Sequence, residues 1–211
     1  MRDFLFSVQT DSWRTAGCRY NAARRLKRRE FISTVSLAFF SALTVALAFL
    51  QRVYAAQPGS QIDNYLTALS ACLGIFLLAI SLIEWGAANG AKTDSLHRNA
   101  EVLNAHSRKI AQTIAELGAG GQVTWGAVDK LRTEYEAIKE SCSHNHEPLD
   151  DRLFLAQKRM AKEFLVNGKP SVCAFEAGWI EVRHWWSSLR SFSLYWAIVV
   201  GLVAATPWFN K

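Results

Sequence analysis

Three long stretches of the chain carry no charged residue, and they set its architecture. They are Phe31–Leu50, Tyr65–Ile83 and Ser191–Asn210, each 19 or 20 residues long. A helix rises about 1.5 Å per residue, so about 20 residues cross a hydrocarbon core of about 30 Å. The pattern predicts an all-α membrane protein with an N-terminal two-span helical hairpin and a third C-terminal span.

The polar section between the second and third stretches has helical spacing. Apolar residues recur every three or four positions, or at multiples of that spacing, at Leu96, Ala100, Leu103, Ile110, Ile114 and Leu117. This spacing places them on one face of a helix, which Gly118–Gly121 ends. Leu131, Tyr135 and Ile138 predict a second helix near residues 124–141.

Two more helices are expected before the third apolar stretch. Asp150 or Asp151 is a suitable N-cap for a helix that continues to about Val166, and Gly168-Lys169-Pro170 then breaks the chain. The last helix covers about 172–190, where an apolar series recurs every three or four positions: Phe175, Trp179, Val182, Trp186 and Leu189. No alternation typical of a strand is found.

Tryptophans surround the start of the third apolar stretch, at Trp179, Trp185, Trp186 and Trp196. Tryptophan favours the membrane interface, so the last polar helix is expected to lie at the headgroups and continue into the span.

Charge orients the spans. Residues 1–30 hold eight Lys and Arg against three acidic residues, the 51–64 loop holds only Arg52, and residues 85–190 hold fourteen basic residues. Because positive loops stay inside, the N-terminus and residues 85–190 are expected in the cytoplasm. Pro58-Gly59 supplies the turn of a short external loop. A cleaved signal peptide is disfavoured, because the apolar region of a signal peptide is 7–15 residues long and Phe31–Leu50 has 20.

The chain thus divides into four parts. A basic amphipathic region, 1–30, precedes a transmembrane hairpin, 31–84; a cytoplasmic helical region, 85–190, precedes a third transmembrane helix, 191–211. Five basic residues crowd the end of the first part: Arg24, Arg25, Lys27, Arg28 and Arg29. They are expected to orient insertion and to meet anionic lipid. Nucleic acid is not the expected partner, because no aromatic recognition motif accompanies them.

Small and hydroxyl residues recur along the first two spans, at Thr34, Ala38, Ser41, Ala42, Ser70, Gly74 and Ser81. In a membrane the lipid is as apolar as the side chains, so helices associate through close packing, and small residues let their backbones approach closely. Two readings follow: the ridges pack the hairpin within one chain, or they also face neighbouring copies in a homo-oligomer whose hydroxyls line a pore.

The chain shows no pattern that predicts catalysis. It has no glycine-rich phosphate loop, nucleophile elbow or His-Glu-x-x-His motif. Cys142, His144 and His146 are metal-ligand types, but they lack the second separated pair that a zinc site needs. We therefore expect no enzyme activity, no metal and no cofactor.

The order of these parts resembles the SLATT family, two-transmembrane effector domains associated with SMODS-type nucleotidyltransferases and SLOG-type sensors in bacteria. The resemblance rests on a basic helix, 21–29, before the hairpin; on Leu96-His97 and Glu101, Leu103 and Asn104; on Tyr135–Ile138; and on a loop motif that includes Asn145, His146 and Asp150. It covers about residues 10–170, and the third apolar stretch departs from a two-span plan.

The resemblance implies a membrane effector of a bacterial anti-phage defence system. A partner protein that makes or senses a nucleotide signal would activate it, and it would then oligomerise and compromise the inner membrane by pore formation. The alternative is a membrane scaffold or adaptor that recruits a soluble partner without forming a pore.

Overall fold

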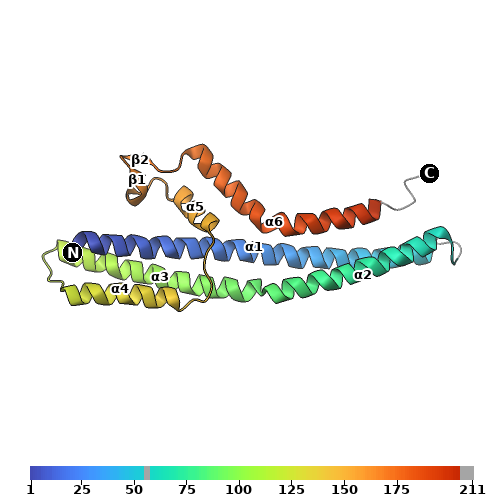
Figure 1. Cartoon of the computed structure of the whole chain (residues 1–211), viewed down its shortest axis with the longest axis horizontal. Coiled ribbons are helices and arrows are strands. Elements are labelled where there is room, and N and C mark those ends of the chain that lie inside the picture. The colour runs from blue at the N-terminus through green and yellow to red at the C-terminus, as the bar shows by residue number, and fades with distance from the viewer. Residues whose placement is uncertain (55–57, 205–211) are drawn as a thin grey trace. The chain divides into compact units, whose positions relative to one another are not determined.

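A computed structural model describes residues 1–54 and 58–204 (Figure 1). The chain forms two compact units: unit 1 contains Met1–Lys27 and Gly90–Ser187, and unit 2 contains Arg28–Asn89 and the chain from Ser188 onward. In chain order the elements are α1 (Arg2–Tyr54), α2 (Gln61–Ala87), α3 (Asn89–Gly118), α4 (Trp125–Glu140), α5 (Pro148–Gln157), the 3₁₀ turn η1 (Lys162–Phe164), β1 (Leu165–Val166), β2 (Lys169–Pro170) and α6 (Ala174–Ala204).

Unit 1 is built on the first half of α1, α3 and α4. Its largest apolar cluster combines Leu5, Val8 and Ala16 of α1 with residues of α3 and α4: Leu103, Ile110, Ile114, Val128, Leu131 and Tyr135. The apolar face predicted for α3 is confirmed, and α3 ends at Gly118 as expected. Helix α4 also lies where predicted, with Thr124 as N-cap, its hydroxyl accepting a hydrogen bond from the Ala127 amide at 3.3 Å.

The segment that follows α4 corrects two predictions. The cap of α5 is Glu147, and the helix ends at Gln157 rather than near Val166. Two short strands then pair as a hairpin, although the sequence reading found none. Asn167 and Gly168 form its turn with positive φ values of 52° and 75°, a backbone that Asn-Gly adopts readily in two-residue hairpin loops.

Helix α6 continues from the polar section into the third apolar stretch, as the sequence predicted. The helix expected near 172–190 and the apolar stretch after it form one uninterrupted helix, Ala174–Ala204. Likewise, α1 continues through the predicted boundary at residue 30 as a single helix of 53 residues. In its first half α6 buries Ala177 and Ile180 against α5.

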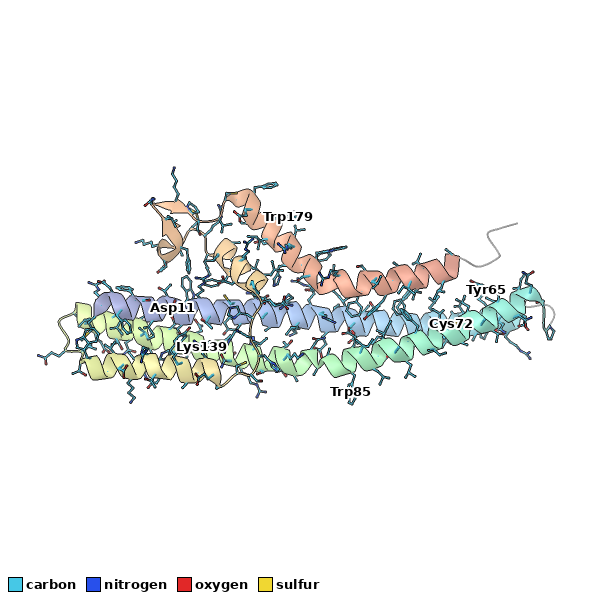
Figure 2. All side chains as sticks on the ribbon, viewed as in Figure 1. Asp11, Tyr65, Cys72, Trp85, Lys139 and Trp179 are labelled. Carbon is cyan, nitrogen blue, oxygen red and sulfur yellow. The ribbon has the colours of Figure 1, made fainter. Side chains whose placement is uncertain are left out.

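Unit 2 contains the apolar hairpin of α1 and α2 together with the end of α6. Its core consists of Phe40, Leu47, Leu69, Leu73 and Val199. Two polar contacts attach α6 to the hairpin. Tyr65, which is labelled in Figure 2, donates through Oη to the Leu202 carbonyl oxygen at 2.9 Å, and Trp196 Nε1 donates to Ser36 Oγ at 3.1 Å.

Two described helical stretches, Arg2–Val53 and Gln61–Gly118, are long and apolar enough to cross a membrane. Phe192–Leu202 is a shorter apolar stretch. The rest of the predicted third span, residues 205–210, lies outside the described residues.

Candidate functional site

Asp150 is the centre of a buried polar cluster in unit 1. It lies in the first turn of α5, where Pro148 and the cap Glu147 start the helix. Its Oδ2 accepts a hydrogen bond from the Glu147 amide at 2.8 Å, which satisfies a backbone donor that the helix leaves free. The Asp150 side chain is fully buried. A buried carboxylate needs partners for its charge, and α1 and α6 supply them.

Arg25 of α1 binds this carboxylate with two parallel hydrogen bonds. Its Nε lies 3.1 Å from Asp150 Oδ1 and its Nη2 lies 3.1 Å from Oδ2. Its third nitrogen, Nη1, reaches Glu147 Oε1 at 2.9 Å. The two-point geometry is the strongest that a guanidinium makes with a carboxylate. Only 13% of the Arg25 side chain is exposed, so the pair is shielded from solvent.

His184 of α6 completes the cluster. Its Nε2 lies 3.1 Å from Asp150 Oδ1, and the imidazole is buried. The side-chain amide of Asn21 donates to the backbone carbonyl oxygen of Asp150 at 3.1 Å. One aspartate therefore connects three helices, of which α1 and α6 both continue into apolar segments. We call Asn21, Arg25, Glu147, Asp150 and His184 the Asp150 cluster.

The electrostatics keep the central pair ionised. Burial alone would raise the pKa of Asp150, but the hydrogen bonds from His184 and Arg25 more than offset it and hold that pKa below its usual range. The pKa of Arg25 is raised, because its carboxylate partners outweigh the effect of burial. A charged cluster of this kind binds structural elements to one another, and the Asp150 carboxylate is fully occupied by its partners in the cluster.

A second contact between α1 and α5 lies beside the cluster. Arg14 binds Asp151 through Nε and Nη2, both at 2.7 Å, and the pairing lowers the pKa of Asp151. The Cys18 thiol donates to Asp151 Oδ1 at 3.3 Å, and burial raises the pKa of that thiol. Gly17 lets the helices meet closely, because a Cβ there would lie 2.1 Å from the Phe154 ring.

The five basic residues predicted to meet lipid are in different surroundings. Arg24 and Lys27 are exposed, with Arg24 donating to the Asn21 side-chain oxygen at 3.1 Å. Arg25 belongs to the Asp150 cluster, so its guanidinium is already paired within the chain. Arg29 Nη2 lies 3.2 Å from Glu84 Oε1, and the Glu84 side chain is only 6% exposed. Arg28 is half-buried and also interacts within the chain.

The span residues predicted to pack or to line a pore fall into two groups. Thr34, Ala38, Ser41 and Ala42 of α1 are exposed, whereas Ser70, Gly74 and Ser81 of α2 are half-buried. Thr34 and Ser81 donate back to carbonyl groups of their own helices, at 3.0 and 2.8 Å. The structure therefore places none of the four α1 residues in the core of its own chain.

The loop motif contributes mainly through Asp150. Asn145 Oδ1 accepts the His146 amide at 2.9 Å, which shapes the loop locally, and burial lowers the pKa of His146. The Cys142 thiol donates to the His144 carbonyl oxygen at 3.3 Å. Among the described residues, no three His, Cys, Asp or Glu side chains are placed to hold a metal ion.

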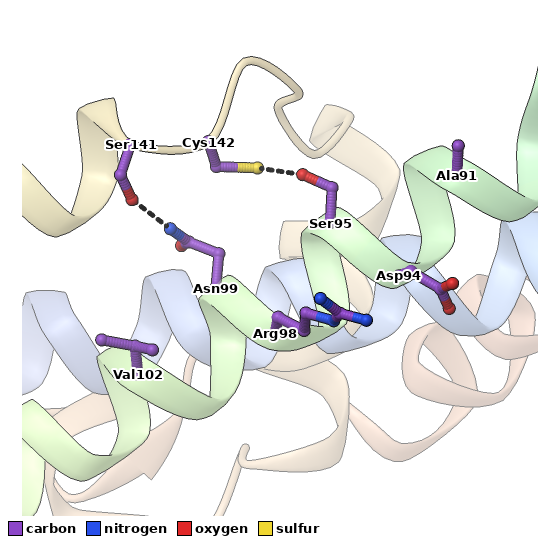
Figure 3. Close-up of a pocket in the computed structure, with 8 residues that line it drawn as sticks. All are labelled: Ala91, Asp94, Ser95, Arg98, Asn99, Val102, Ser141 and Cys142. Carbon is purple, nitrogen blue, oxygen red and sulfur yellow. Dashed lines mark hydrogen bonds between the residues drawn. The ribbon is translucent and has the colours of Figure 1, made fainter.

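A groove of about 480 Å³ lies in unit 1 between α3 and the end of α4 (Figure 3). Its polar side chains are largely paired with one another. Asn99 donates to Ser141 Oγ at 3.1 Å, and the Ser95 hydroxyl and the Cys142 thiol lie 3.4 Å apart. This internal pairing joins α4 to α3, and the charged side chains of Asp94 and Arg98 also line the groove.

Comparison with known families agrees with this arrangement of a helical hairpin and a helical polar unit. Residues 1–208 match the model of SMODS and SLOG-associating 2TM effector domain family 5. The chain belongs to the SLATT family. The match reaches residue 208 and so covers all but the last two residues of the third apolar stretch. No curated protein and no solved structure matches the chain significantly.

SLATT domains associate with SMODS and SLOG signalling components, and they are generally non-catalytic membrane effectors of conflict and defence systems. The two long apolar helices of this SLATT chain are consistent with membrane insertion. Sequence reasoning missed two pairings: that of His184, which stands among tryptophans, with Asp150, and that of Glu84 with Arg29. Neither has a local sequence signal, because each forms through tertiary folding.

Proposed function

We propose that this SLATT protein is a pore-forming effector of an anti-phage defence system. It is activated by a partner protein that makes or senses a nucleotide signal, and it then assembles as a homo-oligomer that compromises the inner membrane. Catalysis and a bound cofactor play no part in this proposal, nor does direct contact with nucleic acid.

The exposed small-residue ridge of α1 carries the proposal. Thr34, Ala38, Ala42 and Ala46 recur every four residues, and all are exposed, whereas the unit 2 core is built from larger side chains. Two glycines of the apolar segments are similar. A Cβ added at Gly74 or Gly201 would meet nothing within 4 Å. Packing within one chain therefore does not require small residues at these positions, and close packing between copies would.

The large exposed side chains of unit 2 support a lipid environment. Val45, Phe49 and Ile75 are each about 70% exposed. A water-soluble protein rarely leaves so much contiguous apolar surface uncovered. We propose that α1 and α2 cross as a hairpin, with the N-terminus and residues 85–190 in the cytoplasm, and that α6 makes a third crossing. The contacts of Trp196 and Leu202 with the hairpin support the third crossing.

Dye leakage tests the proposal on the full chain. The protein is reconstituted into vesicles of phosphatidylethanolamine and phosphatidylglycerol that contain carboxyfluorescein. Parent protein should release the dye, and Ala38→Leu and Gly74→Leu should weaken release by blocking close helix approach. Ala79→Leu, on another exposed side of α2, is the matched control and should leak like the parent.

Two results would contradict the proposal. Vesicles that hold inserted parent protein and retain the dye, with the partner present, would indicate a scaffold or adaptor. Equal leakage by parent, Ala38→Leu and Gly74→Leu would show that these positions are not the assembly surface.

A further inference from the structure

The first half of α6 presents a large apolar face to its surroundings. Phe175 is 86% exposed and Trp179 is 63% exposed, and Trp179 can be located in Figure 2. Val182, Trp185 and Trp186 are each more than half exposed. Steps of three or four residues place these five side chains on one side of the helix, which we call the α6 aromatic face. An exposed apolar surface of this size indicates contact with something other than water.

The other side of the same helix is already packed within unit 1. Ala177 and Ile180 are buried with α5, and His184 is bonded to Asp150. The α6 aromatic face is therefore not a core surface that has lost its partner within the unit. The series Phe175, Trp179 and Trp186, which the sequence suggested as a helical face, is the outward one.

We propose that the α6 aromatic face lies in the headgroup layer of the bilayer. Three of its five residues are tryptophans, whose ring is apolar and whose N–H needs a polar partner, and this combination favours the interface over a dry core. Exposed Arg183 and Arg190 fall on one border of the face by helical spacing, where they can reach lipid phosphates. The acidic Glu176 shares this border, and Glu181 borders the face on its opposite edge, beside Trp185.

The end of the aromatic face is close in sequence to the apolar stretch of α6. Trp186 lies six residues before Phe192, where the apolar stretch begins, which is about 9 Å of helix. The headgroup layer on each side of a bilayer is about 5–8 Å thick, so Trp186 is already close to it. Phe175 lies 17 residues before Phe192, or about 25 Å. For Phe175 to reach the same layer, this half of α6 must lie along the surface.

Site-directed spin labelling of the full chain in phosphatidylethanolamine and phosphatidylglycerol vesicles tests the inference. Cys72, Cys142 and Cys173 are replaced by Ser, and buried Cys18 is retained. A nitroxide is then placed at Phe175→Cys. Power saturation compares its accessibility to oxygen, which concentrates in lipid, with its accessibility to a water-soluble nickel chelate.

Two matched labels calibrate the result. Glu181→Cys is exposed on the same helix but outside the aromatic face, and Val45→Cys is exposed within the first apolar stretch. The ratio of oxygen accessibility to nickel accessibility at Phe175 should lie between the high ratio at Val45, in hydrocarbon, and the low ratio at Glu181, in water. Trp179→Cys should repeat the Phe175 result and guards against a local effect of one label.

Every other outcome overturns the inference. Nickel access at Phe175 equal to that at Glu181 would place the face in water. Protection from both reagents would mean that protein covers it, whether a second copy or another partner. The inference rests on the proposed membrane location, and the Val45 label tests that location separately. Nickel access at Val45 would overturn the proposed function. An unexpected result at Phe175 alone would overturn only the inference about the α6 aromatic face.

Discussion

Arg25→Gln is the most direct test of the Asp150 cluster. Glutamine keeps part of the side-chain length but removes the charge and the two-point geometry. Asp150, fully buried, would keep its carboxylate with His184 as its remaining side-chain partner. The structure therefore predicts a large loss of stability from a substitution within a run of similar basic residues.

The magnitude follows from the burial of the pair. Removing one partner of a buried ion pair typically costs about 3–5 kcal/mol, because the other charge is left uncompensated. The Arg25 contact with Glu147 adds little, because the Glu147 side chain is 60% exposed. For a chain of 150–250 residues, about 1 kcal/mol lowers Tm by about 2–4 °C, so the expected fall is about 6–20 °C.

Thermal unfolding of detergent-purified full-length protein measures this fall. Lys27→Gln is the control, since Lys27 is exposed two residues away and should shift stability by at most about 0.5 kcal/mol. A double-mutant cycle with Asp150→Asn should give a coupling energy of about 0.5–3 kcal/mol. Equal melting of Arg25→Gln and Lys27→Gln would refute the reasoning.

Acid should weaken the same cluster. The pKa of Asp150 is lowered in the folded protein, so its stabilising effect is complete above the unfolded value of about 3.9 and is lost as pH falls through the folded value. The stability difference between parent and Asp150→Asn should therefore hold at pH 7 and shrink below about pH 4. Arg25, His184 and Glu147 face the titrating group.

Three further outcomes are expected. Reporter fusions after Pro58 and after Gly121 should read outside and inside respectively, and equal readings would contradict the topology. Gly17→Ala should cost about 1–3 kcal/mol of stability by overpacking α5 against α1, measured by the same thermal unfolding, and an unchanged Tm would show that the helices separate freely. Cys142→Ser with His144→Ala should leave folding and dye release nearly intact, whereas stoichiometric zinc in the purified protein would show that the loop binds metal.

The sequence predicted the structure best where an apolar pattern recurs over many residues. The face of α3 could be read from Leu96, Ala100, Leu103 and Ile110, because spacing alone places such residues on the buried side. The two apolar helices followed from length and absence of charge in the same way. The family followed from the order of these elements.

Prediction failed at short elements and at pairings. Asp150 was taken as a cap because its residue type favours that position, but Glu147 precedes it and the Asp150 carboxylate points into the cluster. The α6 aromatic face has the spacing of a core face, and only the structure shows that His184 and Ile180 occupy the buried side. The pairing of Arg25 with Asp150 joins residues 125 positions apart, and no local rule selects it.

The basic run before the first span gains a second role from this pairing. Asn21, Arg25 and Arg29 are spaced by four residues and so lie along one face of α1. Asn21 and Arg25 bind Asp150, and Arg29 binds Glu84. Arg24 and Lys27 are exposed, and the predicted contact with lipid headgroups concerns these two residues. Arg25 lies six residues before Phe31, and His184 lies eight before Phe192. A single carboxylate therefore connects α1 and α6 shortly before each becomes apolar, so a change in the Asp150 cluster would act on both of these helices at once.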